Sequence, residues 1–374
     1  MSAAQWRRAM NSGAQATQAV ALPAGGHVVS AASAMPSSAP QIAREPWRNP
    51  IAARHVVVLL ALLLYPFFAT PFFTFQIAGQ ALVLGTIALS LTFLAGSGGM
   101  VSLAQMTVAG LAGYLVAIFG TSASPISLGW PWWVAVLLAI VIATAFATFV
   151  GWLAVRTEGI YTIMITLAIG VAFYYLVLQN YSIFNGFQGF HKVTPPVVWG
   201  VDFGQATPYY FLASFWALAS YFFIKYLLRA PFGVALQGVR DNPRRMNALG
   251  FHVTAHRVAA YAIAGLIAAI GGILLLWYNK LITPGVVGTG ALINVLVVAV
   301  LGGMRHPIGP FIGAIVFVLL QTFAIDTIFR ERFNLVIGTI FLVIVLFSSD
   351  GLLGWWARLR SGTGGGQARL REPK

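Results

Sequence analysis

Cysteine is absent from this 374-residue sequence, and charged residues make up only 8% of it. The first absence excludes disulfides and thiolate metal sites. The second falls far below the roughly 25% of charged residues found in soluble domains. No Asp, Glu, Lys or Arg occurs between Val56 and Val155. One crossing of a bilayer takes about 20 apolar helical residues, so this stretch indicates a polytopic helical membrane protein.

Ionisable side chains are also missing from the interior of the apolar runs, because acidic residues and histidines lie in tails, loops or at run ends. Ion-coupled transporters and pumps keep such groups inside the membrane, which disfavours proton coupling. Coupling to sodium is not excluded by this absence, because neutral oxygens can bind sodium. Ser97 has no histidine within an apolar run to pair with, so a serine hydrolase is not supported.

Nucleotide and metal motifs are missing as well. No G-x-x-x-x-G-K-[ST] loop and no metal-ligand cluster occurs. The chain is therefore predicted to be no enzyme and to bind no cofactor itself. Its net charge of +14 fits basic cytoplasmic loops, and without interleaved basic and aromatic residues we expect no nucleic acid partner.

Glycine, proline and charged residues divide the apolar sequence into candidate spans. These are residues 55–75, 77–97, 101–119, 131–155, 159–180, 208–228, 257–277, 288–304, 308–326 and 333–349. Spans 101–119 and 288–304 are short or rich in small and polar residues, which also fits re-entrant segments. The predicted fold is an all-α membrane protein, a polytopic helical bundle of about 8–10 transmembrane helices.

The basic residues predict the orientation of this bundle, because cytoplasmic loops carry an excess of Lys and Arg. With both termini cytoplasmic, all but four of the 22 basic residues lie inside. The four exceptions are Lys192, Lys280, Arg330 and Arg332. This orientation places a loop at 181–207 outside and a loop at 229–256 in the cytoplasm.

Composition divides the chain into three regions. Residues 1–50 are rich in Ala, Ser, Gln, Gly and Pro, which predicts a disordered cytoplasmic tail. Residues 51–350 form the transmembrane domain. Residues 351–374 are predicted to be a second cytoplasmic tail.

The segment GVRDNPRRMNALGFHV concentrates charge in an otherwise apolar chain. Asp241 or Asn242 suits a helix N-cap, and Pro243 suits the first helical position. Gly250 is placed as the residue that ends the helix. A helix of about seven residues is too short to be stable alone, so it must dock. The dock is either the membrane face, with arginines at anionic headgroups, or a groove in a partner protein.

Polar side chains recur inside the predicted spans. Hydrogen bonding between membrane helices explains such residues, and a neutral lining of a solute path is the alternative. The candidate path residues are Ser102, Gln105, Thr107, Thr162, Thr166 and Asn294.

Several stretches resemble LivM-type permeases. GVRDNPRRMNALGFHVTAHRVAAYAIAGLIAAIGGIL resembles their cytoplasmic loop and next helix, with the pattern A-[IV]-R-[DE]-[ND]-x-x-x-A-x-A-L-G. RTEGIYTIMITLAIG, NGFQGF, VVAVLGGMRHPIGPFIGAIV and GGMVSLAQMTVAGLAGYLVAI resemble further family motifs. The resemblance covers about residues 77–345, with the motifs in the family's order. The residues that match the loop pattern are Arg240, Asp241, Asn242, Ala248, Leu249 and Gly250.

This resemblance implies a membrane subunit of an ABC importer for branched-chain amino acids in a bacterial inner membrane. Its implied partners are ABC ATPase subunits that use ATP, a second, LivH-like permease subunit and a periplasmic solute-binding protein. The short cytoplasmic helix would be the coupling helix seated in the ATPase. The residues assigned to this interface are Arg240, Asp241, Asn242, Arg244, Arg245, Ala248, Leu249 and Gly250.

Some residues depart from the family pattern. Gln105 stands where many relatives have His, and Met106 and Thr107 replace small apolar residues. We expect a small solute, either a branched-chain amino acid or a related amino acid or amide. The alternative function is a passive channel or a self-contained secondary transporter for a small neutral solute.

Overall fold

The computed structural model describes residues 62, 64–198, 200–327, 338–339 and 351–352. The predicted cytoplasmic termini, the tails and most of span 333–349 lie outside these ranges, as does the first part of span 55–75. All further statements about structure concern the described residues.

Long apolar helices form where the uninterrupted apolar runs predict them. Within the described ranges, five helical segments are long and apolar enough to cross a membrane. They are the π-helix η2 (Phe73–Gly79) continuing into α3 (Gln80–Gly98), α5 (Trp132–Ala154), α6 (Ile160–Gln179), α8 (Ala206–Leu227) and α11 (Val253–Asn279). The predicted all-α polytopic membrane fold is confirmed.

Three further apolar helices are shorter. They are α4 (Gln105–Phe119), α12 (Thr289–Gly302) and α13 (Gly309–Thr327). α4 and α12 have 15 and 14 residues, fewer than the about 20 that one crossing requires. Both belong to the spans that the sequence marks as short or unusually polar.

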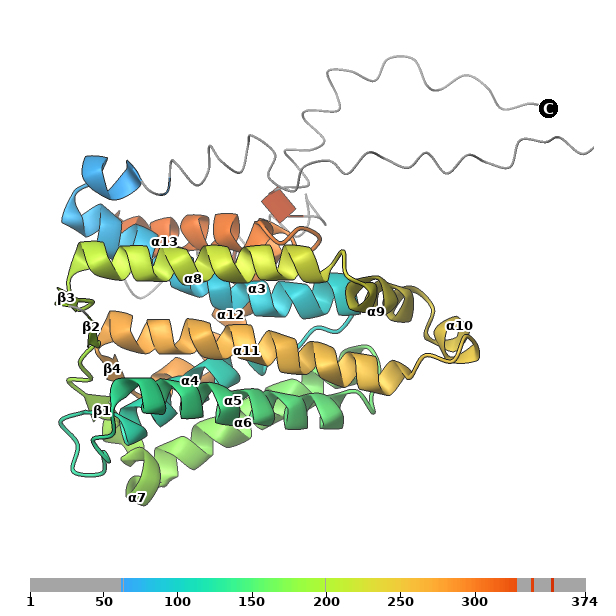
Figure 1. The fold of residues 1–374 in the computed structure, drawn as a ribbon, viewed down its shortest axis with the longest axis horizontal. Coiled ribbons are helices and arrows are strands. Elements are labelled where there is room, and N and C mark those ends of the chain that lie inside the picture. The colour runs from blue at the N-terminus through green and yellow to red at the C-terminus, as the bar shows by residue number, and fades with distance from the viewer. Residues whose placement is uncertain (1–61, 63, 199, 328–337, 340–350, 353–374) are drawn as a thin grey trace, which may run out of the picture. The chain divides into compact units, whose positions relative to one another are not determined.

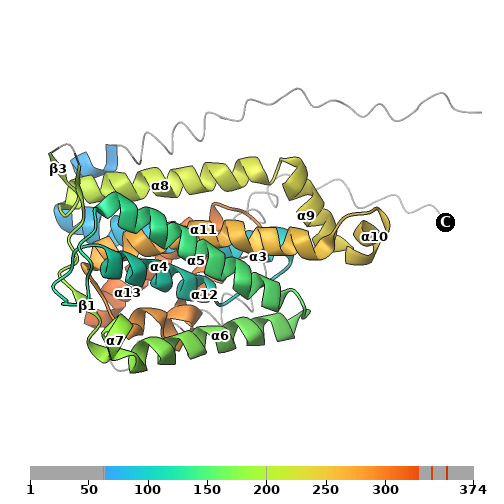
Figure 2. The ribbon, with the colours of Figure 1, turned by 60° about the horizontal axis from the view of Figure 1, so that its bottom comes forward.

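The centre of the bundle consists of α3, α4 and α11. More of α3 and α11 is buried than of α5, α6 or α8, and nearly every residue of α4 is buried. Figure 2 shows α8 and α6 on opposite sides, with α11, α4 and α5 between them. The outer helices present their remaining apolar faces outward, as expected for helices in contact with lipid.

Small residues let the central helices approach closely. An added Cβ at Gly272 of α11 would lie 1.9 Å from the backbone oxygen of Ala109 in α4, so only glycine fits there. On α5, every fourth residue from Ala135 to Ala147 is a buried alanine. Membrane helices associate through such small-residue contacts because lipid supplies no hydrophobic driving force between them.

The two ends of the bundle carry different connections (Figure 1). One end holds the predicted external loop, which contains short helices and strands and pairs with the connection that follows α11. Short helices and strands occur in both connections. They are α7 (Tyr181–Phe184), η3 (Gly186–Gln188), β1 (Phe190–His191), β2 (Val197–Val198) and β3 (Val201–Asp202), followed later by β4 (Leu281–Ile282) and η4 (Pro284–Val287). β1 pairs antiparallel with β4, and β2 with β3.

The opposite end holds α9 (Pro231–Asp241) and α10 (Pro243–Ala248). Lys192 and Lys280 lie at the other end, beside the short strands β1 and β4. Lys280 Nζ donates a hydrogen bond to the Gly204 oxygen at 3.1 Å, which ties two parts of this end together.

Candidate functional site

The connection between α8 and α11 contains two helices rather than one. The sequence predicts a helix only from Pro243, but α9 precedes it and α11 already begins at Val253. Proline occupies the first turn of α9, and Leu236 and Val239 bury its inner face. α9 packs against α3 and α11. The missed signal was this proline together with the i, i+3 apolar spacing.

α10 has caps at both ends. Asn242, not Asp241, is the N-cap, and its Oδ1 accepts a hydrogen bond from the Arg245 backbone N–H at 2.9 Å. At the other end Gly250 has φ +88°, a conformation that glycine adopts without strain. Phe251 N–H donates to Met246 O, and Gly250 N–H to Asn247 O, both at 3.0 Å. These two bonds form a Schellman motif, as the sequence predicts.

α10 projects from the end of the bundle and has no buried residue (Figure 1). The side chain of Met246 packs against α9, because an added Cβ at Gly238 of α9 would lie 2.9 Å from the Met246 sulfur. Leu249, by contrast, is 66% exposed. The exposed residues of this helix and its C-terminal end include Arg244, Arg245, Ala248, Leu249 and Gly250.

Arg240 and Asp241 belong to the last turn of α9, and the side chain of Arg240 bonds within the chain. Arg240 Nη1 donates to the Gly96 oxygen near the C-terminus of α3. Its Nε donates to Asp241 Oδ1 at 2.8 Å. A cation at a helix C-terminus is electrostatically favourable, so Arg240 links the loop to a central helix.

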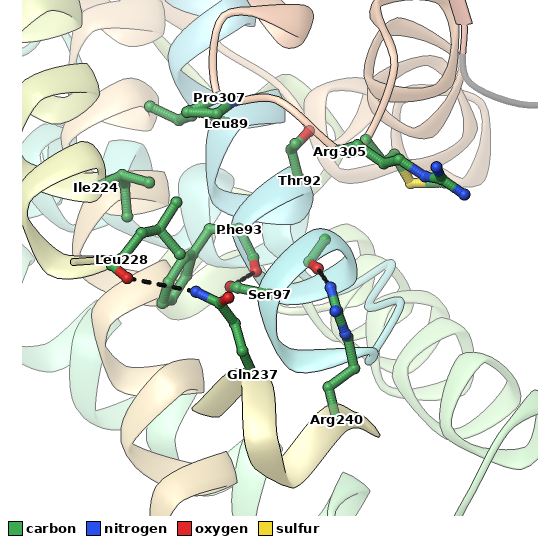
Figure 3. Close-up of a pocket in the computed structure, with 12 residues that line it drawn as sticks. Leu89, Thr92, Phe93, Ser97, Ile224, Leu228, Gln237, Arg240, Arg305 and Pro307 are labelled. Carbon is green, nitrogen blue, oxygen red and sulfur yellow. Dashed lines mark hydrogen bonds between the residues drawn. The ribbon is translucent and has the colours of Figure 1, made fainter. Parts of the chain in front are cut away.

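A cavity of about 140 Å³ lies between α3, α8, α9 and the connection from α12 to α13 (Figure 3). Leu89 and Phe93 contribute apolar walls, and Thr92, Gln237 and Arg240 contribute polar groups. The Thr92 hydroxyl is buried and has no hydrogen-bond partner among the described residues. At this point α9 does not close tightly on the bundle.

Four of the six candidate path residues, Ser102, Gln105, Thr107 and Thr166, lie at or beside a break between α3 and α4. Gly99, with φ +66°, ends α3, and residues 99–104 are not helical. The Leu103 N–H donates to Thr166 Oγ1 of α6 at 3.2 Å, outside the backbone pattern of a helix. α4 begins at Gln105, four residues after the start of the predicted span 101–119.

Three of these residues have hydrogen-bond partners. Gln105 Oε1 accepts a hydrogen bond from Ser90 Oγ at 3.2 Å, which joins α4 to α3. Thr166 joins α6 to the break. Thr162 Oγ1 donates to the backbone oxygen of Thr157, just before α6, at 3.0 Å. Gln105 and Thr166 therefore act as interhelical contacts.

The other three candidates differ from these. The hydroxyls of Ser102 and Thr107 are fully buried and lack a hydrogen-bond partner among the described residues. Asn294 is exposed on α12, and none of the hydrogen bonds described joins it to this group. The sequence interpretation missed Tyr261 of α11, which is buried beside Ser102.

Comparison with known proteins identifies the family. Residues 73–346 match the family described as branched-chain amino acid transport system / permease component. The high-affinity branched-chain amino acid transport system permease proteins LivM of Salmonella typhimurium and Escherichia coli are each 24% identical over 248 residues. This alignment covers 60% of the chain and 58% of each relative's length.

A further relative is the probable branched-chain amino acid transport permease protein LivH of Methanocaldococcus jannaschii, which is 25% identical over 126 residues. That alignment covers 33% of this chain and 39% of the relative. No solved structure matches the chain. The family match includes both the α3–α4 break and α10 and extends over most of the sequence. This multi-pass membrane protein therefore belongs to the branched-chain amino acid permease family, a family of transport proteins and not of enzymes.

Proposed function

We propose that this chain is the membrane-spanning permease subunit of an ABC importer in a bacterial inner membrane. It translocates a small solute, a branched-chain amino acid or a related amino acid or amide. Separate ATPase subunits drive the transport, and α10 is the helix that they contact. A LivH-like second permease subunit completes the membrane part, and a periplasmic solute-binding protein delivers the solute.

The exposure of α10 is the observation that carries this proposal. A six-residue helix without buried residues gains too little from its own hydrogen bonds to be stable alone. Caps at both ends nevertheless fix its geometry, and the apolar side chain of Leu249 is left uncovered. Such a fixed, exposed helix suits insertion into a groove of another protein.

The residues of the predicted interface then divide into two roles. Arg244, Arg245, Ala248 and Leu249 make the contact with the ATPase. Arg240, Asp241, Asn242 and Gly250 hold α10 in place on the bundle. Because Arg240, in the last turn of α9, bonds to the end of α3, a displacement of α10 passes through α9 to a central helix. A passive channel would have no use for such a device.

The relatives support the assembly. Similarity to both LivM and LivH proteins fits a membrane part built from two related permease subunits. The solute path follows the polar residues at the α3–α4 break, with Ser102 and Thr107 as the hydroxyls that remain available to a solute.

The substitution Leu249→Asp tests the proposed coupling. We expect membrane insertion to be unchanged, because the side chain is exposed. Co-purification of the ATPase subunits should fall at least about tenfold, since a charge in an apolar groove costs more than about 1.4 kcal/mol. Hydrolysis stimulated by the binding protein should fall with it.

Val234→Asp is the matched control, because Val234 is similarly exposed but lies on α9. It should keep at least half of the wild-type co-purification. Wild-type values for Leu249→Asp in both assays would exclude α10 as the coupling helix.

A further inference from the structure

The cavity beside α9 has an apolar side and a charged side. Phe93 of α3 and Ile224 of α8 are buried and form part of its apolar wall. Figure 3 shows Ile224 and Leu228 on one side of the cavity, and Arg240 and Arg305 on the other. Its volume of about 140 Å³ is roughly ten times the minimum that a single water requires. The cavity can therefore hold part of a larger molecule that is apolar at one end and polar at the other.

One polar group in the cavity wall lacks a partner. Thr92 is 3% exposed, and its hydroxyl has no hydrogen bond within the part of the chain that the structure describes. The other polar side chains of the wall differ: Ser97 Oγ donates to the Phe93 oxygen, and Gln237 Nε2 donates to the Leu228 oxygen at 3.3 Å. Buried polar groups are normally paired. A molecule in the cavity that carries an oxygen acceptor would supply the partner that Thr92 lacks.

Positive charge surrounds the polar side of the cavity. Arg240 and Arg305 line it, and Arg229 directly follows the lining residue Leu228. The carboxylate of Asp241 lies 2.8 Å from Arg240 Nη2. Three guanidinium groups thus lie around a site to which the lining segments and their neighbours contribute one carboxylate. Guanidinium groups bind phosphate oxygens through charge-assisted hydrogen bonds, so the site favours a phosphate over a neutral group.

The cavity is bordered by apolar surface of the bundle. Phe223 and Tyr226, on either side of the lining residue Ile224 in the sequence of the outer helix α8, are exposed. Ile308, directly after the lining residue Pro307, is exposed as well. The bundle end that carries α9 and α10 (Figure 1) is the predicted cytoplasmic end. Basic pockets between membrane helices at the cytoplasmic face suit anionic lipid headgroups.

We propose that this cavity binds one anionic phospholipid of the cytoplasmic leaflet, such as phosphatidylglycerol. The lipid phosphate lies at Arg240 and Arg305, an ester or phosphate oxygen accepts from Thr92, and the first part of an acyl chain contacts Phe93 and Ile224. Inorganic phosphate offers the same oxygens but no chain for the apolar wall, which favours the lipid. The lipid then bridges α3, α8 and α9. This proposal goes beyond the proposed function, because it depends on neither the solute nor the ATPase.

The test uses the full-length chain, purified and delipidated in detergent, with three probes: phosphatidylglycerol, phosphatidylcholine with the same acyl chains, and glycerol 3-phosphate. A ligand that binds only the folded state raises its thermal midpoint. Phosphatidylglycerol should do so at a concentration at least about tenfold lower than phosphatidylcholine, as expected for two cations at the headgroup. Glycerol 3-phosphate should have no effect at that concentration. Native mass spectrometry should show one retained phosphatidylglycerol.

Two variants and two matched controls locate the lipid. Arg305→Gln and Thr92→Val should each need at least about fivefold more phosphatidylglycerol for the same shift, because each loses one headgroup contact. Arg156→Gln removes an exposed cation after α5, at the same end of the bundle. Thr144→Val removes another buried hydroxyl that has no partner among the described residues, on α5. Both controls should respond within a factor of about two of the wild type.

Three results would overturn the proposal. Equal half-maximal concentrations of the two phospholipids would show a general effect of lipid. Equal stabilisation by glycerol 3-phosphate would assign the site to a soluble phosphate. A wild-type response in both Arg305→Gln and Thr92→Val would mean that the lipid binds elsewhere. If these variants do not fold, the comparison of the three probes on the wild type decides.

Discussion

α10 and α4 are both too short to cross a membrane, yet they are stabilised in opposite ways. α10 has six residues, no buried side chain and backbone or side-chain caps at both ends. α4 has 15 residues, almost all buried, and no side-chain cap at its N-terminus. Local hydrogen bonds fix the exposed helix, whereas packing fixes the buried one. The difference teaches that an exposed helix depends on its caps for a defined shape, while a packed helix inside the bundle can leave polar groups unpaired.

The packing of α4 gives the largest expected effect. In Gly272→Leu, the new side chain would collide with the backbone at Ala109, because its Cβ would lie 1.9 Å from the carbonyl oxygen. We expect destabilisation by more than about 3 kcal/mol and a loss of most monodisperse protein in size-exclusion chromatography.

Gly290→Leu on α12 is the control, since an added Cβ there meets nothing within 4 Å. It should elute like the wild type. Equal losses for both variants would mean that the close contact between α4 and α11 does not limit stability.

Paired and unpaired hydroxyls near α4 give an intermediate effect. Thr166→Val leaves the buried Leu103 N–H without its acceptor, at a cost of about 1–3 kcal/mol. Thr107→Val removes a buried hydroxyl that has no partner in the described region, so it should be neutral or stabilising. Thermal unfolding in detergent compares the two, and an equal cost for both would contradict the assignment of partners.

The caps of α10 give the smallest effect. Asn242→Ala removes the acceptor for the Arg245 N–H and should destabilise the helix by about 1 kcal/mol. Hydrogen exchange of the α10 amides should accelerate accordingly. Asn247→Ala, on the same helix but not at its cap, should leave the exchange rates within a factor of about two. Similar rates for both variants would mean that Asn242 does not cap α10.

Local signals made much of the fold predictable. Spans 131–155 and 159–180 are uninterrupted apolar runs, and α5 and α6 begin and end within two residues of them. The caps of α10 were also predictable, because Asn242 and Gly250 act on residues next to them in sequence. α9 was missed because the run of residues with helical apolar spacing is short and the last turn of the helix is charged.

Pairs distant in sequence were beyond prediction. Ser90 and Gln105 are 15 residues apart, and Leu103 and Thr166 are 63 apart. A polar residue in an apolar run gives no sign of which neighbour it will reach.

The contact at Gly272 has a mechanical consequence. A side chain at an interface can change rotamer and let two helices slide, but a backbone carbonyl has no such freedom. At this contact α11 meets the main chain of α4 directly. We therefore expect the two helices to move together at this contact, and any alternation of access to occur where side chains, rather than backbones, meet.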